Sequence, residues 1–138
     1  MTTRARSARE ERPPEAARLL VVAPGADRDG LFRGLSAQAA YEVRFAGGVD
    51  EAAEALRAAP VALLIAAPEV ATAEVSRLLA EADRLRPGPP ALPVLVVRNR
   101  QAEEPPAWAR RGVGVLRCPL LPEALSRSVG VVLGLAGR

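Results

Sequence analysis

Residues 61–66 (VALLIA) form an unbroken apolar run. A strand with one face in water alternates polar and apolar side chains, whereas a run that is apolar throughout is typical of a strand buried on both faces. Residues 92–97 (LPVLVV) form a second run of the same kind. Two such strands predict the centre of a parallel sheet that helices cover on both faces.

Strand and helix patterns alternate along the rest of the chain. Further strands are predicted at residues 18–23, 41–45 and 113–117. Helical patterns follow the strands at residues 27–35, 50–59, 75–85 and 122–135, and residues 101–111, which contain Pro105-Pro106, can hold only a short helix. Parallel strands need crossover connections, and these helices supply them. We therefore expect an α/β fold, namely a doubly wound five-stranded parallel sheet with five flanking helices.

The chain of 138 residues fits one domain with a short tail. Residues 1–16 are charged, rich in alanine and interrupted by Pro13-Pro14, so we expect a flexible charged tail before a single domain at residues 17–138. The longest apolar runs are too short to span a bilayer, and no secretory signal is visible near the amino terminus. These features predict a cytoplasmic protein without membrane insertion.

The basic residues of the chain are all arginine, 19 in number, and histidine is absent. This composition excludes lysine Schiff bases, histidine acid–base catalysis and histidine-ligated metals. Cys118 is the only cysteine, which excludes an intramolecular disulfide and a cysteine-based zinc site. We therefore expect no metal and no cofactor. The net charge is +3, but the arginines and acids after residue 18 nearly balance, so nucleic-acid binding is not expected.

Four landmarks follow one another along the chain. An apolar first strand covers residues 19–23, and the runs PVALLI and LPVLVV cover residues 60–65 and 92–97. The closing segment leads from Gly112 through Cys118-Pro119-Leu120 to Pro122-Glu123-Ala124-Leu125. With these landmarks the chain resembles the receiver domain of bacterial response regulators over about residues 18–136. Receiver domains are flavodoxin-like, so the resemblance implies the strand order 2-1-3-4-5.

An active receiver carries two acids after its first strand, Asp at the end of the third, Thr or Ser at the end of the fourth, and Lys after the fifth. The acids hold magnesium through oxygen ligands, and the Asp accepts a phosphoryl group that the Lys and the hydroxyl bind. The matching positions here are Ala23 and Pro24, Ala66, Arg98, and Cys118. None has the required group, so the resemblance implies a degenerate receiver, or pseudo-receiver, that lacks the phosphorylation residues.

These observations lead to the hypothesis of a pseudo-receiver that is not an enzyme. It would act as a protein–protein interaction module in signal transduction or regulation, independent of aspartyl phosphorylation. In the family, the face made by the fourth helix, the fifth strand and the fifth helix commonly makes contacts, which implies a signalling protein or a second copy as the partner. Trp108, Val131 and Leu135 are the candidate interface residues. The competing interpretations place Trp108 in the core and treat the last helix, with Gly130 and Gly134, as a flexible, loosely packed end.

Arg98 and Arg100 flank Asn99 at the carboxyl end of a central strand, where such sheets bind ligands. Arginine forks suit phosphate and carboxylate, so the alternative function is a small-ligand or anion sensor that uses this pair. The competing interpretation is a loop whose charges lie in water. Asp27 and Asp29 are interpreted as a helix cap and a solvated charge. A third hypothesis, an enzyme of another flavodoxin-like family, would need polar groups where the strand ends carry alanine and proline.

Overall fold

The computed structural model describes residues 16–25 and 30–136. The strands are β1 (Ala17–Val22), β2 (Tyr41–Ala46), β3 (Leu63–Ala66), β4 (Val94–Arg98) and β5 (Gly114–Arg117). Neighbouring strands run parallel, in the order β2-β1-β3-β4-β5. The predicted fold class, a doubly wound flavodoxin-like sheet of order 2-1-3-4-5, is therefore confirmed.

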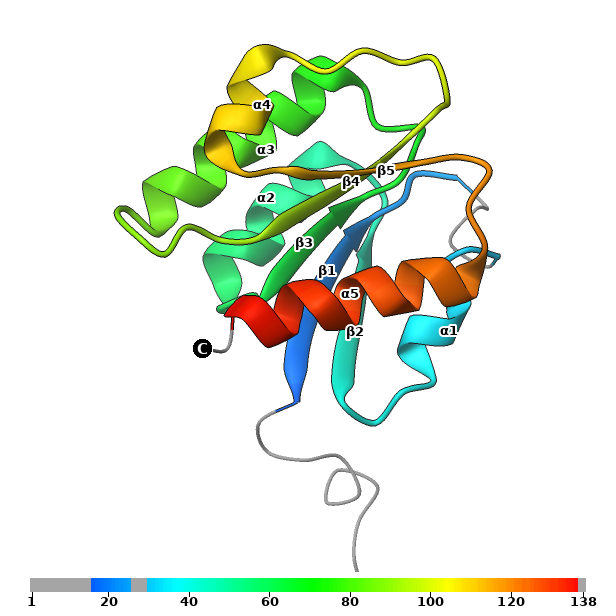
Figure 1. Ribbon diagram of the computed structural model, residues 1–138. Coiled ribbons are helices and arrows are strands. Elements are labelled where there is room, and N and C mark those ends of the chain that lie inside the picture. The colour runs from blue at the N-terminus through cyan, green and yellow to red at the C-terminus, as the bar shows by residue number, and fades with distance from the viewer. Residues whose placement is uncertain (1–15, 26–29, 137–138) are drawn as a thin grey trace, which may run out of the picture.

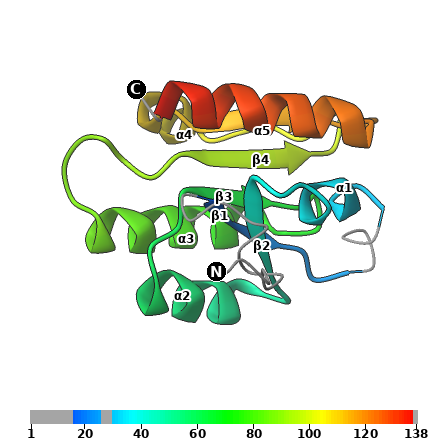
Figure 2. The same ribbon diagram turned by 90° about the horizontal axis from the view of Figure 1, so that it is seen from below.

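Helices cover both faces of this sheet. Within the described residues they are α1 (Arg33–Ser36), α2 (Val49–Ala58), α3 (Thr72–Leu85), α4 (Pro106–Arg111) and α5 (Pro122–Ala136). The helices α1 and α5 lie on one face, and α2, α3 and α4 lie on the other (Figure 1). Seen from below, α2 and α3 lie on the opposite side of the strands from α5 (Figure 2).

Alternate side chains of the inner strands enter two separate cores. In β1, Leu20 and Val22 pack with α2, α3 and α4, whereas Leu19 and Val21 pack with α1 and α5. Successive strand residues point to opposite faces of a sheet, so a strand between two helical layers is apolar at every position. This geometry explains the unbroken apolar runs that predicted the central strands.

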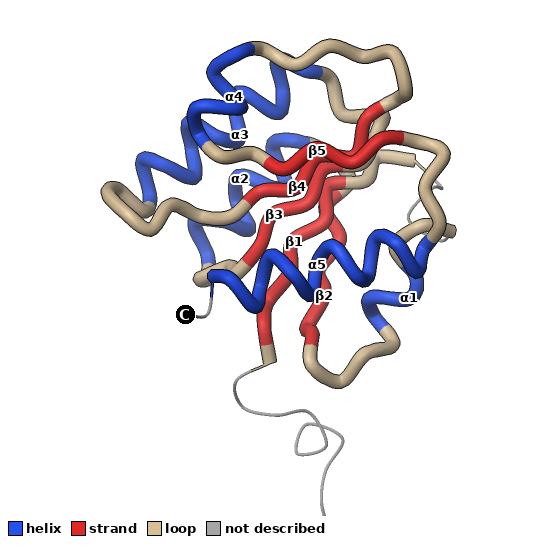
Figure 3. The backbone as a smooth tube through the Cα atoms, viewed as in Figure 1, coloured by secondary structure: helices blue, strands red, loops and turns tan. Residues whose placement is uncertain are grey.

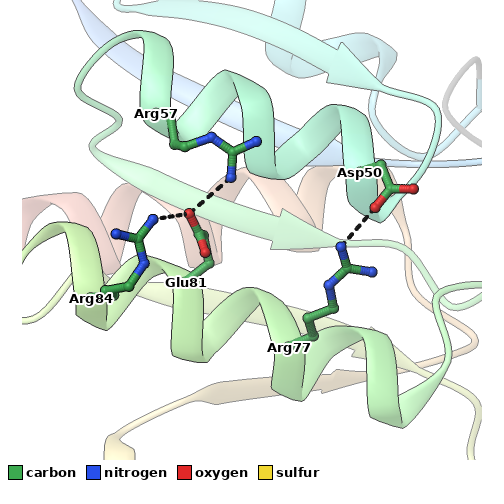
Figure 4. Close-up of polar contacts among 5 residues, drawn as sticks. All are labelled: Asp50, Arg57, Arg77, Glu81 and Arg84. Atoms are coloured by element: carbon green, nitrogen blue, oxygen red, sulfur yellow. Dashed lines mark hydrogen bonds and ion pairs between the residues drawn. The ribbon is translucent and has the colours of Figure 1, made fainter.

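Ion pairs join α2 to α3 on the surface of their layer (Figure 4). Arg77 Nη2 lies 2.8 Å from Asp50 Oδ1, and Glu81 Oε2 accepts hydrogen bonds from Arg84 Nη2 at 2.6 Å and Arg57 Nη1 at 3.0 Å. The hydrogen bond from Arg84, followed by that from Arg57, holds the pKa of Glu81 below its usual value. Exposed pairs of this kind add little stability.

The limits of the first helix could not be placed from the sequence, although its inward-facing Phe32 and Leu35 could. The first helix is a single turn, and Phe32, just before it, is as fully buried as Leu35 within it. Burial of these two side chains therefore holds the segment in place more than helix length does. Asp27 and Asp29, interpreted above as a cap and a solvated charge, lie outside the described residues. Of the helices that the structure describes, none is long and apolar enough to cross a membrane.

Candidate functional site at the carboxyl ends of the strands

The carboxyl ends of the strands lie at one edge of the sheet, because all strands run in the same direction (Figure 1). Ala23 follows β1 and Ala66 ends β3, and both side chains are buried. Pro24 is exposed, and Cys118, directly after β5, is half-buried. Arg98 is the last residue of β4. The positions that the sequence singled out therefore all belong to this edge.

Arg98 is buried, with only 7% of the residue exposed. Its Nη1 donates a hydrogen bond to Thr72 Oγ1 at the start of α3, at 3.0 Å, and its Nη2 donates to the Glu103 carbonyl at 2.9 Å. Its guanidinium carbon lies 5.1 Å from the ring centroid of Trp108, which is a cation–π contact. The charge is therefore held inside the protein by two neutral acceptors and an aromatic face.

This position of Arg98 corrects the predicted anion-binding pair. The donors of Arg98 point to Thr72 and to the loop backbone, whereas Arg100 is exposed. An arginine that recognises an anion presents its fork of donors to the ligand. Burial removes Arg98 from that role, and the same burial contradicts the competing interpretation in which the charge of Arg98 lies in water.

Trp108 of α4 is a core residue, with 2% of it exposed. Its indole Nε1 donates a hydrogen bond to Ser76 Oγ of α3 at 3.1 Å. Nearby, Arg111 of α4 forms an ion pair with Asp83 of α3 through three hydrogen bonds, the shortest of which is 2.8 Å. The interpretation of Trp108 as a packing residue is confirmed. Its interpretation as a partner anchor is wrong, because the ring is covered within its own chain.

Arg117 is the residue of this edge that the sequence analysis missed. It ends β5 and lies in register with Arg98 of β4. Its Nη1 donates hydrogen bonds to the carbonyls of Asn99 and Ala102, and its Nη2 bonds to the Glu104 carboxylate. The β4–α4 loop is thus held from both strands. The sequence did contain a signal for this role, because Arg98 and Arg117 each stand at the end of a strand and the two strands are neighbours.

These side chains do not fit a hard divalent cation. Magnesium takes oxygen ligands, and Ala23, Pro24 and Ala66 have no side-chain oxygen. In residues 16–25 and 30–136, no three acidic, histidine or cysteine side chains come together in a group that could hold a metal. The side chains described at this edge are therefore arginines and small apolar residues, without the oxygen ligands that magnesium needs. We assign no phosphoryl-transfer step to this edge.

The last helix exposes part of its apolar content. Leu125 and Val129 are fully buried against the sheet, but Val131 is 58% exposed. Leu121, just before the helix, is 70% exposed. The side chain of Leu135, the other interface candidate on this helix, lies outside the described part of the structure. Val131 is therefore the candidate on α5 that the structure places at the surface.

Comparison with known proteins gives matches only at the level of structure. No protein-family model matches the sequence, and no curated protein matches it. A CheY-like response regulator receiver domain protein from Methanospirillum hungatei JF-1 matches with a TM-score of 0.69 and 18% identity, over 88% of this chain and 96% of that chain.

Two further receivers show the same likeness. The receiver domain of the hybrid histidine kinase CckA matches with a TM-score of 0.63 and 25% identity, over 85% of this chain and 99% of its own. A response regulator receiver protein from Sinorhizobium medicae WSM419 matches with a TM-score of 0.64 and 19% identity, over 88% of this chain and 98% of its own. The chain therefore has the fold of CheY-like response regulator receiver domains.

Proposed function

We propose that this chain is a pseudo-receiver, a non-catalytic protein–protein interaction module that acts in cytoplasmic signal transduction or regulation without aspartyl phosphorylation. The receiver-like fold supports the signalling role. The main support for a non-catalytic module that acts without phosphorylation is the position of Arg98. This residue is buried at the end of β4 and forms hydrogen bonds within its own chain.

The chemistry of the strand ends supports independence from phosphorylation. Ala66, at the position where a receiver carries its phosphoacceptor, has no carboxylate and cannot form an acyl phosphate. At the position of the receiver hydroxyl, Arg98 is buried and donates hydrogen bonds from Nη1 to Thr72 and from Nη2 to the Glu103 carbonyl. Cys118 takes the place of the lysine and brings no fixed positive charge. An incoming phosphoryl group would meet neither a carboxylate phosphoacceptor nor a free cation at these positions.

The β4–α4 loop supports a module with one constant surface. Arg98 bonds to the Glu103 carbonyl, and Arg117 bonds to Asn99, Ala102 and Glu104. A conformational switch needs an element with two arrangements of similar free energy. A loop that is bonded from two strands favours one arrangement, and the surface beside it is then permanently available to a partner.

We place the partner, a signalling protein or a second copy of the chain, on the face made by α4, β5 and α5. This face lies beside the loop that Arg98 and Arg117 hold. Val131 of α5 contributes an exposed apolar side chain for a partner to cover.

A phosphorylation assay tests the proposal. The chain is incubated with acetyl phosphate and magnesium, beside a receiver with an intact phosphoacceptor as the positive control, and both are measured by intact mass spectrometry. The control should gain a hydroxylamine-labile phosphate, whereas this chain should gain none. A stoichiometric, hydroxylamine-labile phosphate on this chain would overturn the proposal.

A further inference from the structure

The opposite end of the sheet is hollowed around the connection between α2 and β3. Three adjoining hollows of about 350, 490 and 190 Å³ open there, and Pro60 and Val61 line all three. We call this surface the amino-terminal groove. It lies where the strands begin, at the end of the sheet away from the strand arrowheads (Figure 1).

Most of the groove is apolar. Its aliphatic and prolyl lining comes from the ends of α2 and α3, the starts of the strands, and the end of α5: Leu56, Pro60, Val61, Leu85, Pro90, Leu92, Pro93 and Leu133. Leu85, at the end of α3, is 40% exposed. The end of α5 comes close to the α2–β3 connection, which brings Leu133 into the same surface (Figure 3). Such a surface is a candidate docking site.

The rim of the groove is positively charged. Arg18, Arg44, Arg57 and Arg86 line the three hollows, against one acid, Glu42. Glu42 pairs with Arg18 at 3.4 Å, and Arg57 is taken by a glutamate of α3 (Figure 4).

Two rim arginines, Arg44 and Arg86, have free guanidinium groups. Within residues 16–25 and 30–136, neither makes a hydrogen bond or an ion pair through its side chain. Arg86 lines both larger hollows, so its charge stands between two apolar depressions. A ligand that fills these hollows would therefore meet an exposed cation without a partner in the described residues at their junction.

We propose that the amino-terminal groove binds an acidic peptide segment of a partner protein. Aliphatic side chains of the segment would fill the two larger hollows, and a carboxylate between them would bind Arg86. Charge complementarity decides between occupants. Residues 1–15 of this chain, which precede the groove residues Ala16 and Ala17, contain four arginines and three glutamates, so their net charge has the same sign as the rim. Of the α4–β5–α5 face, only the end of α5 at Leu133 reaches this groove, and the proposal does not depend on the pseudo-receiver function.

A peptide selection tests this proposal on the full chain. A display library of random segments of about 12 residues is selected on the wild-type chain, and the most enriched segments are synthesised with a fluorescent label. Binding is measured by anisotropy for wild type, Arg86→Glu, Arg86→Gln and the control Arg33→Glu. Arg33 is also exposed and lies on α1, outside the groove, so its substitution makes the same charge change elsewhere.

We expect the selected segments to be acidic and to carry aliphatic residues. Their Kd should rise about tenfold or more with Arg86→Glu, by the loss of one charged hydrogen bond, and should change less than about twofold with Arg33→Glu. Added salt should weaken binding to the wild type. Because Arg86 follows the last residue of α3, unfolding is measured for each variant, and Arg86→Gln carries the test if Arg86→Glu does not fold.

Other outcomes overturn the proposal. Enrichment of basic or uncharged segments, or no enrichment, would exclude an acidic peptide as the occupant. Equal effects of Arg86→Glu and Arg33→Glu would place the binding site elsewhere. Sedimentation measures self-association in parallel. A wild-type dimer that Arg86→Glu breaks would show that a second copy fills the groove in place of a partner peptide. A phosphate on this chain would overturn the pseudo-receiver proposal but would not change the peptide-binding results. The failure of one proposal can therefore be told apart from the failure of the other.

Discussion

Replacing Arg98 by alanine should destabilise the fold by about 2–4 kcal/mol. The side chain makes two hydrogen bonds from a charged donor, at 3.0 and 2.9 Å, and each bond of this kind contributes roughly 1.5–3 kcal/mol. The cation–π contact with Trp108 at 5.1 Å adds about 1–2 kcal/mol. Against this gain stands the cost of keeping a charge out of water, which is several kcal/mol and is relieved in the variant. The truncation also opens a cavity beside Trp108, which adds to the loss.

Urea unfolding at neutral pH measures this loss, and Arg100→Ala is its matched control. Both residues are arginines near the end of β4, but Arg100 is exposed, so its truncation should cost about 0.5 kcal/mol or less. Trp108 is the only tryptophan, so its fluorescence should change on truncation of Arg98 alone. Hydrogen exchange gives a local reading, because loss of the bond to the Glu103 carbonyl should accelerate exchange in the β4–α4 loop.

Arg98→Met separates packing from bonding, since methionine keeps much of the side-chain volume but has no donors. The free energy of unfolding should recover about half of the loss seen with alanine, while exchange in the loop stays fast. The reasoning is refuted if Arg98→Ala costs no more than Arg100→Ala and leaves the fluorescence of Trp108 unchanged. That result would place the Arg98 side chain in water and reopen the anion-sensor hypothesis.

Two more predictions concern the helices. The pKa of Glu81 is lowered in the folded state by Arg84 and Arg57, so its contribution to stability is present above its usual pKa of 4.5 and is lost as the pH falls through the lower folded value. Glu81→Gln should therefore be less stable than wild type at neutral pH and equal to it in strong acid, by urea unfolding at both. Val131→Glu should abolish partner association by sizing and pull-down yet shift stability by about 0.5 kcal/mol or less. Unchanged association would exclude Val131 from the interface.

The architecture was predictable because burial on two faces leaves a direct trace in sequence. A strand between two helical layers has no position that tolerates water, so VALLIA and LPVLVV mark β3 and β4 without any alignment. Element limits were less predictable. The expected strand at residues 61–66 begins only at Leu63, since where pairing starts depends on the neighbouring strands. Residues 27–35 carry a helical pattern, and in the part described from residue 30 onward the helix is a single turn, with Phe32 outside it.

The site was less predictable because a long side chain can turn either way. Sequence places Arg98 at a strand end, but its partners Thr72 and Glu103 come from the start of α3 and from the next loop. The periodicity of apolar residues along the sequence predicts helices and strands, but it does not predict hydrogen bonds between side chains and distant segments. Trp108 shows the complementary case, since its size alone favours burial and the structure confirms it. Arg117 was missed because its role depends on register with Arg98, which only strand pairing defines.

A buried arginine is a poor choice for stability alone, because removing its charge from water costs about as much as its hydrogen bonds return. Arg98 nevertheless joins the start of α3, the β4–α4 loop and Trp108 of α4. Directional bonds fix one arrangement of these elements, whereas apolar contacts alone allow several packings of similar free energy. The charge is therefore best explained by the single loop arrangement that it selects. A fixed loop is also what a surface beside it needs if it is to bind a partner without a phosphorylation step.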